Sequence, residues 1–127
     1  MIYEFEAQAI QIEVNHFYSF SNDVTVGFGE LNEKGKLKTY LVLRRFAKDG
    51  DFDDGYYVEW CKKKNSAYNC IDLFEFSQNK ARILFKKEVK FAKEIIITFE
   101  IDDEHFQDIT KCLRDIIFRN SNYFSIK

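Results

Sequence analysis

The stretch that decides the fold is residues 55–118, which read GYYVEWCKKKNSAYNCIDLFEFSQNKARILFKKEVKFAKEIIITFEIDDEHFQDITKCLRDIIF. In residues 56–60, and again in residues 95–101, every second residue is a large apolar one. This period of two is typical of β-strands. The polar residues 77–80 separate two further alternating runs and predict a hairpin turn. The stretch therefore predicts consecutive, mainly antiparallel strands.

One segment near the C-terminus has a helical period instead. Its apolar residues fall on a single stripe, at Phe106, Ile109, Leu113, Ile116 and Ile117. Asp102 stands just before it and is a good N-cap, because its carboxylate can accept a hydrogen bond from a free backbone N–H. The polar residues 120–122 are expected to end the helix. The sequence thus predicts one C-terminal α-helix.

The first half of the chain also predicts strands. Residues 2–14 alternate, but the phase changes near Ala9 and Ile10, which predicts one strand carrying a β-bulge. Residues 37–46 are substantially apolar on both faces, which is typical of a central strand covered on both sides. The polar residues 61–67 predict a loop.

These patterns predict a single α+β domain over residues 1–127. We expect mainly antiparallel β-structure, with about eight strands in a twisted, sandwich-like arrangement and one C-terminal α-helix. The hydrophobic fraction is 46%, and 14 Phe and 7 Tyr supply much of it. A chain of this size and composition can build its core without metal or disulfide bonds.

Composition also narrows the classes of function. The formal net charge of -2 provides no strong field for nucleic acid, and no apolar run approaches the roughly 20 residues that span a bilayer. Cys61, Cys70 and Cys112 are an odd number without C-x-x-C spacing, which favours reduced thiols. Residues 1–6 lack a basic leader and an apolar block, so we expect no signal peptide. The expected location is the cytoplasm, with no membrane partner.

Neither a metal site nor a catalytic site is predicted. Asp49, Asp51 and Asp53 resemble the start of a calcium loop, but the positions that require Gly and Glu hold Asp54 and Trp60. An acidic, solvated turn is the simpler interpretation.

The two histidines, His16 and His105, have no partner at metal-ligand spacing. His105 and Cys112 are seven residues apart on the predicted helix, which puts them about 10 Å apart, too far for direct proton transfer. We therefore expect no enzyme activity and no cofactor.

Two alternatives stay open on the residues alone. A basic face for RNA would be formed by Lys62, Lys63, Lys64, Lys80, Arg82, Lys86, Lys87, Lys90 and Lys93. Aromatic residues are interleaved with it, as base stacking requires, but no RNP-type motif is present. The aromatic content is also compatible with a β-barrel that holds a small ligand, although most of the rings fall on predicted core faces.

The second half of the chain resembles the immunity protein 10 family of bacterial polymorphic-toxin systems. The resemblance rests on DGYYVE at 54–59, NSAYNCI at 65–71, LFEF at 73–76, SQNK at 77–80, IIITF at 95–99 and the closing amphipathic helix. It covers about half the chain, and it departs from the family pattern at Asn69 and Cys70, where that pattern tends to have glycine. The resemblance implies a cytoplasmic protein that binds and neutralises a cognate toxin, and it implies no catalytic residues.

A binding surface can be suggested from charge and predicted exposure. Many toxins of such systems are nucleases with basic clefts, so an acidic contact is expected. We assign this contact to Asp49, Asp51, Asp53 and Asp54, backed by Tyr57. The expected partner is the toxin domain, and the sequence leaves a homodimer open.

Overall fold

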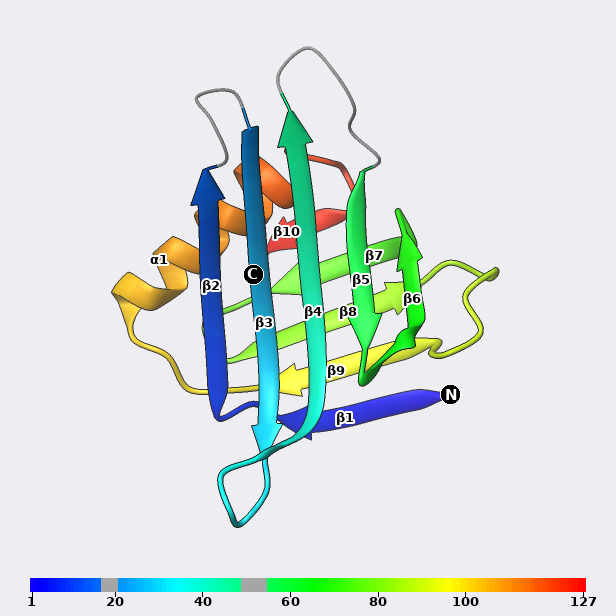
Figure 1. Cartoon of the computed structure of the whole chain (residues 1–127), viewed down its shortest axis with the longest axis vertical. Coiled ribbons are helices and arrows are strands. Elements are labelled where there is room, and N and C mark those ends of the chain that lie inside the picture. The colour runs from blue at the N-terminus through cyan, green and yellow to red at the C-terminus, as the bar shows by residue number, and fades with distance from the viewer. Residues whose placement is uncertain (17–20, 49–54) are drawn as a thin grey trace.

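The computed structural model describes residues 1–16, 21–48 and 55–127, which form two five-stranded sheets and one C-terminal helix (Figure 1). The sheets pack face to face, and the strands of one run across those of the other, as in an orthogonal sandwich. The predicted α+β class, mainly antiparallel with a C-terminal helix, is confirmed. The strands number ten in the described part, rather than about eight.

One sheet, here called the meander sheet, is wholly antiparallel and has the order β2-β3-β4-β5-β6. Each strand pairs with the next one along the chain, because short connections favour antiparallel neighbours. Its strands are β2 (Ala9–His16), β3 (Ser21–Leu31), β4 (Leu37–Lys48), β5 (Tyr56–Trp60) and β6 (Lys62–Tyr68).

The other sheet, the mixed sheet, has the order β1-β9-β8-β7-β10. Its centre is antiparallel, whereas β1 lies parallel to β9 and β10 parallel to β7. Its strands are β1 (Ile2–Glu6), β7 (Ile71–Phe76), β8 (Lys80–Phe85), β9 (Glu94–Thr98) and β10 (Phe124–Ile126). The predicted hairpin at residues 77–80 joins β7 to β8 and is confirmed.

The prediction of one bulged strand over residues 2–14 is wrong. The chain leaves the mixed sheet after Glu6 and enters the meander sheet at Ala9. The backbone N–H of Ala7 still donates to Thr98 in the mixed sheet, at 2.8 Å, whereas that of Gln8 donates to Gly29 in the meander sheet, at 3.0 Å. The phase change marks this crossover, which turns the apolar side chains of both strands toward the same core.

Two further expectations are corrected. Residues 61–67 were expected to form a loop, but most of them form β6. Cys61, at φ 61°, makes the tight turn from β5 to β6. β4 is central in its sheet, yet only one of its faces is covered. Leu41 and Leu43 are buried on the inner face, whereas Phe46 on the outer face is 43% exposed.

The C-terminal helix begins as α1 (Asp103–Lys111) and continues as a π-helical segment, η1 (Cys112–Ile117). Asp102 caps it as predicted, accepting a hydrogen bond from the backbone N–H of His105 at 2.8 Å. In η1 the backbone N–H of Phe118 donates to Leu113, five residues earlier, at 2.8 Å. This wider turn brings Leu113 and Phe118 to the same side, and both are fully buried.

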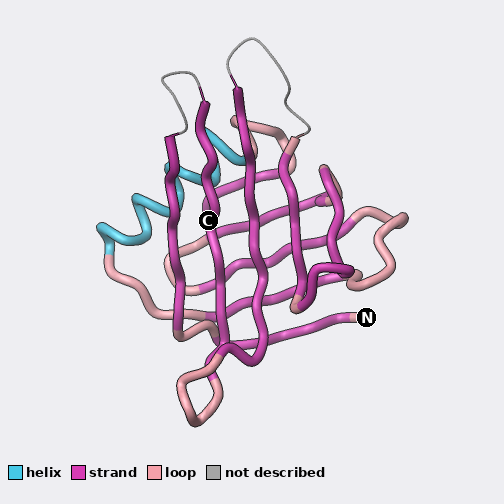
Figure 2. Tube along the Cα trace, in the orientation of Figure 1, coloured by secondary structure: helices cyan, strands magenta, loops and turns pink. Residues whose placement is uncertain are grey.

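The helix closes one end of the sandwich, where it packs beside both sheets (Figure 2). The core there is aromatic. Phe76 from the mixed sheet stacks on Phe106 of α1 at 5.4 Å between ring centroids, and Phe74 contacts Phe118 at 5.3 Å. Such pairs contribute about 0.5–1.5 kcal/mol each beyond the burial of their area. The inner faces of β3, β4 and β5 are also buried in the core, which leaves their outer faces for function.

Candidate functional site

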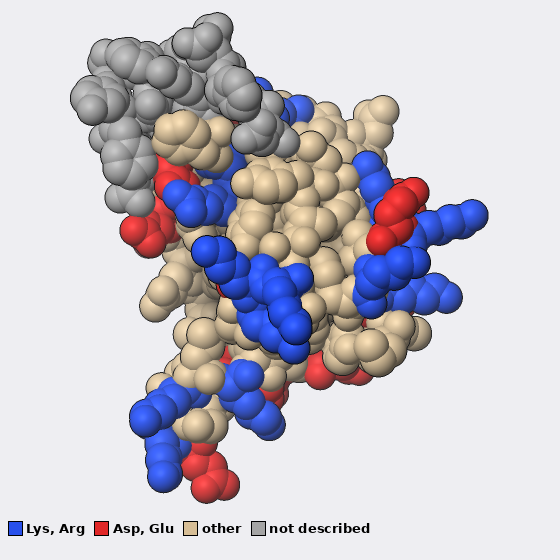
Figure 3. Space-filling view, turned by 45° about the vertical axis from the view of Figure 1, so that its right-hand side comes forward, with Lys and Arg blue, Asp and Glu red and all other residues tan. Residues whose placement is uncertain are grey.

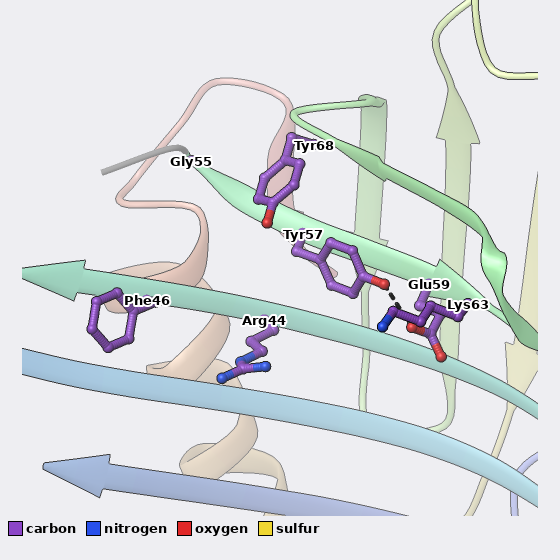
Figure 4. A pocket seen from close by; sticks show the side chains of 7 residues that line it. All are labelled: Arg44, Phe46, Gly55, Tyr57, Glu59, Lys63 and Tyr68. Atoms are coloured by element: carbon purple, nitrogen blue, oxygen red, sulfur yellow. Dashed lines mark hydrogen bonds between the residues drawn. The ribbon is translucent and has the colours of Figure 1, made fainter. Parts of the chain in front are cut away.

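The outer face of the meander sheet carries an open hollow of about 640 Å³ (Figure 4). We call the surface that lines it the aromatic patch. It consists of Arg44, Phe46, Gly55, Tyr57, Glu59, Lys63 and Tyr68. These side chains come from β4, β5 and β6. Alternation along β5 explains their direction, because Tyr56, Val58 and Trp60 are buried in the core while Tyr57 and Glu59 face outward.

A carboxylate joins two tyrosines at the centre of this face. Glu59 accepts a hydrogen bond from the hydroxyl of Tyr57 at 2.6 Å and another from the hydroxyl of Tyr40 at 2.5 Å. These two hydrogen bonds lower the pKa of Glu59, and the nearby Lys63 acts in the same direction. Glu59 therefore stays ionised over a wide range of pH and holds both phenol rings in place.

The same arrangement affects the tyrosines. Burial and, after it, the hydrogen bond to Glu59 raise the pKa of Tyr40 to about 12. The pKa of Tyr57 is raised as well, first by burial and then by its hydrogen bond to Glu59. Both hydroxyls therefore remain neutral donors at physiological pH.

The aromatic rings form the apolar part of the patch. Tyr57 lies opposite Tyr68 in the pairing of β5 with β6, and their ring centroids are 5.4 Å apart. Tyr68 is 56% exposed and Phe46 is 43% exposed. A single exposed ring is common on protein surfaces, whereas contiguous exposed apolar surface marks interaction sites.

A charged pair sits at the same face. Arg44 donates from Nε to Asp23 Oδ1 at 2.8 Å, and its Nη2 contacts the other carboxylate oxygen, so the pair is bidentate. Asp23 is buried, whereas the Arg44 side chain is half exposed. The buried carboxylate fixes the guanidinium plane, because a bidentate pair restricts both position and rotation.

The titratable side chains that line the patch are Glu59, Lys63, Arg44 and the two tyrosines. The patch contains neither histidine nor cysteine among its residues. Cys61, at the nearby turn, has its pKa raised by burial, which disfavours the thiolate. Within residues 1–16, 21–48 and 55–127, no group of three or more His, Cys, Asp or Glu could hold a metal ion.

The sequence-predicted site residues fall in two groups. Tyr57 lines the aromatic patch. Asp49, Asp51, Asp53 and Asp54 lie outside the described residues. Gly55 follows them directly in the sequence and lines the patch.

Sequence reasoning missed Arg44, Phe46, Glu59 and Tyr68 as members of the site. The alternation of β4 and β5 already put the first three on one face. Tyr68 could have been found only by reading residues 62–68 as a strand, because its pairing with β5 brings it opposite Tyr57.

Several other residues that were considered from the sequence do not line the aromatic patch. His105 is half-buried in the first turn of α1, and Cys112 is buried where η1 begins. Cys61, Cys70 and Cys112 are free thiols. Arg82, from the suggested basic face, is bound to Glu94 at 2.8 Å and to Glu75 at 3.3 Å on the mixed sheet. It is therefore neutralised by its neighbours.

No protein-family model matches this chain, and comparison with curated proteins and with solved structures gives no match. The resemblance to the immunity protein 10 family therefore stays a prediction from the sequence. The described part of the chain has no helix with the length and hydrophobicity needed to cross a membrane.

Proposed function

We propose that this protein is an immunity protein, which binds a cognate polymorphic toxin in a stoichiometric complex and thereby inhibits it. In this proposal the protein acts in the cytoplasm of the cell that makes the toxin, and it neither makes nor breaks covalent bonds. The proposal rests on the sequence resemblance and on the aromatic patch.

The observation that carries the proposal is the combination of exposed rings and fixed charges on one rigid sheet face. Tyrosine and arginine are enriched among the residues that dominate protein–protein binding. Tyr57 is held by Glu59, and Arg44 is held by Asp23. Side chains that are already ordered lose less conformational entropy on binding, so more of the contact energy appears as affinity.

The acidic segment at residues 49–54 favours a basic partner. Four aspartates precede Gly55 in the sequence, whereas the described lining of the patch carries Glu59 beside the cations Arg44 and Lys63. An acidic segment suits a toxin with a basic cleft, because complementary charge speeds encounter and disfavours wrong partners. In this account the rings of Tyr57 and Tyr68 supply affinity, and the carboxylates supply orientation.

The proposal predicts a toxin gene beside the gene of this protein, and it is tested with the toxin domain of that gene. The toxin domain is expressed from an inducible promoter in a bacterial host, with and without this protein, and survival is counted. We expect full survival only when both are present. A matched strain carries the Tyr57→Ala and Tyr68→Ala double variant, which should protect poorly although it accumulates to the same level. Killing that is unaffected by the intact protein would refute the proposal.

A further inference from the structure

A second hollow lies between the two sheets, on the side away from the helix. It has a volume of about 480 Å³ and runs between β6 and residues 86–91, which lie in the connection from β8 to β9. At its floor the backbone N–H of Lys86 donates to the carbonyl of buried Cys70 at 2.9 Å. We call it the lysine trough, because Lys64 lines one side and Lys86 and Lys90 line the other.

The trough concentrates positive charge in a chain whose net charge is -2. Figure 3 shows Lys and Arg at several places on this side of the molecule, with an uncharged region between those near the middle and those at the right. Among the residues that the structure describes, Glu88 is the only acidic one that lines the trough. In the described part of the chain, Lys64, Lys86 and Lys90 form no ion pair.

The protection of a sheet edge explains Lys64 but not Lys86 and Lys90. β6 is an edge strand, and lysines on edge strands commonly prevent unwanted pairing. The connection that carries Lys86 and Lys90 is not a strand and has no edge to protect. Like charges that face one another across a hollow repel, so their gathering is unfavourable unless an anion lies between them.

The free edge of β6 indicates what kind of anion fits. β6 pairs with β5 on one side only, so its other side presents backbone N–H and C=O groups toward the trough. An extended peptide can add to such an edge through main-chain hydrogen bonds. We propose that the lysine trough binds an acidic polypeptide segment, which adds a strand to β6 and places its carboxylates against Lys64, Lys86 and Lys90.

Nucleic acid fits the trough less well. Single-stranded nucleic acid is held by aromatic rings on which bases stack. Phe91 is turned inward against Phe85, at 5.5 Å between centroids, and Tyr68 is paired with Tyr57 on the outer face. Among the described residues that line it, the trough therefore offers charge and a strand edge, with Tyr68 as its one largely exposed ring.

This inference does not depend on the toxin-binding proposal. The trough shares only Tyr68 with the aromatic patch. Variants at Lys64, Lys86 and Lys90 leave Tyr57 and Glu59 intact. Failure of one proposal is thus distinguishable from failure of the other.

The test is fluorescence anisotropy with a labelled ten-residue peptide of alternating Glu and Thr. The test variant is Lys64→Gln/Lys86→Gln/Lys90→Gln. The matched control is Lys34→Gln/Lys36→Gln/Lys38→Gln, which removes three exposed lysines at and after the β3–β4 turn. We expect saturable binding to the unaltered protein and to the control, and at least about tenfold weaker binding to the test variant, since three exposed ion pairs are lost.

Two further probes separate the parts of the proposal. The same peptide N-methylated at every residue keeps its side-chain charge but loses all of its main-chain donors, so we expect it to bind at least about tenfold more weakly. Circular dichroism checks that each variant is folded. Equal weakening in both lysine variants, undiminished binding of the methylated peptide, or tighter binding of a ten-nucleotide single-stranded RNA would each overturn the proposal.

Discussion

Tyr57 donates its hydroxyl hydrogen to Glu59 at 2.6 Å, and both side chains lie on the outer face of β5. Residues two apart on a strand share a face, so this contact follows from the strand itself. The second oxygen of Glu59 is occupied by Tyr40 from the neighbouring strand β4. The three side chains therefore tie two strands together and fix the ring that we place at the centre of the binding surface.

Two substitutions of Tyr57 separate the contribution of its ring to toxin binding from that of its hydroxyl. We expect Tyr57→Ala to weaken toxin binding by about 2 kcal/mol or more, because a buried aromatic anchor is lost. Tyr57→Phe keeps the ring and should cost about 1 kcal/mol or less, since only one hydrogen bond is removed. Isothermal titration calorimetry measures both. Gln11→Ala, at an exposed position on β2, serves as the control and should bind like the unaltered protein. Equal affinity for Tyr57→Ala and the control would remove Tyr57 from the interface.

A second prediction concerns the negative charge of the acidic segment, residues 49–54. We expect Asp51→Ala/Asp53→Ala/Asp54→Ala to slow association with a basic toxin, because long-range attraction is reduced. The slowing should be largest at low ionic strength and should fade as salt screens the charges. Stopped-flow or surface-resonance association rates at several salt concentrations measure this effect. Unchanged rates at low salt would show that the segment does not face the toxin.

The pKa of Tyr40 gives a prediction at alkaline pH. It is raised from 10.0 to about 12 by burial and by its hydrogen bond to Glu59, so the folded state favours the neutral phenol. The resulting stabilisation is present below pH 10 and is lost as the pH rises from 10 to 12. Glu59→Gln removes the charge but leaves the burial, so the pKa of Tyr40 should fall only partway toward 10.0. Tyrosinate absorbance during a pH titration measures the shift. An unaltered titration curve would mean that Glu59 does not hold Tyr40.

Two glycines give a matched pair for stability. Gly55 has φ +94°, and a Cβ there would meet the side chain of Asn69. Gly55→Ala should therefore destabilise the protein by about 1–3 kcal/mol. Gly27 has open space around the position of a Cβ, so Gly27→Ala should change stability by less than about 1 kcal/mol. Urea unfolding compares the two variants, and similar midpoints would contradict this account of the backbone at Gly55.

Thr110 offers a stabilising change. Its side-chain oxygen is buried and has no hydrogen-bond partner among the described residues. Thr110→Val keeps the shape and removes the unsatisfied hydroxyl, so we expect stability to be unchanged or higher by up to about 1 kcal/mol. Thr110→Ser keeps the hydroxyl and loses a buried methyl group, which should cost about 1 kcal/mol. Thermal unfolding compares the two variants. A lower melting temperature for Thr110→Val than for Thr110→Ser would show that the hydroxyl has a hydrogen-bond partner.

The fold class could be predicted from the sequence because its signals are local. Alternation found most strands, and Asp102 marked the start of the helix. The π-helical segment was missed because the predicted stripe assumed 3.6 residues per turn. Under that period Leu113 and Phe118 point to different sides, and only the wider turn buries both. β10 was missed because three residues are too few to show a period.

The errors in strand pairing had a different cause, because the pairing of strands depends on residues that are far apart in the sequence. The crossover after Glu6 looked like a bulge because both events shift the phase of alternation by one residue. β6 looked like a loop because Lys62, Lys63 and Lys64 are polar on both faces, which an edge strand tolerates. That error hid Tyr68, and with it the ring beside Tyr57. Of the aromatic patch, the sequence therefore indicated Tyr57 as a toxin contact and Lys63 as part of the alternative basic face.

The most direct measurement is a titration of toxin activity with this protein. A fixed amount of the toxin domain whose gene is predicted to lie beside that of this protein is mixed with increasing amounts of the protein, and the residual toxin activity is recorded. Our account predicts a linear fall to zero at one equivalent. Toxin released by denaturation and refolding should regain its full activity and its original mass. Complete inactivation by a small fraction of an equivalent, or recovery of a chemically altered toxin, would contradict it.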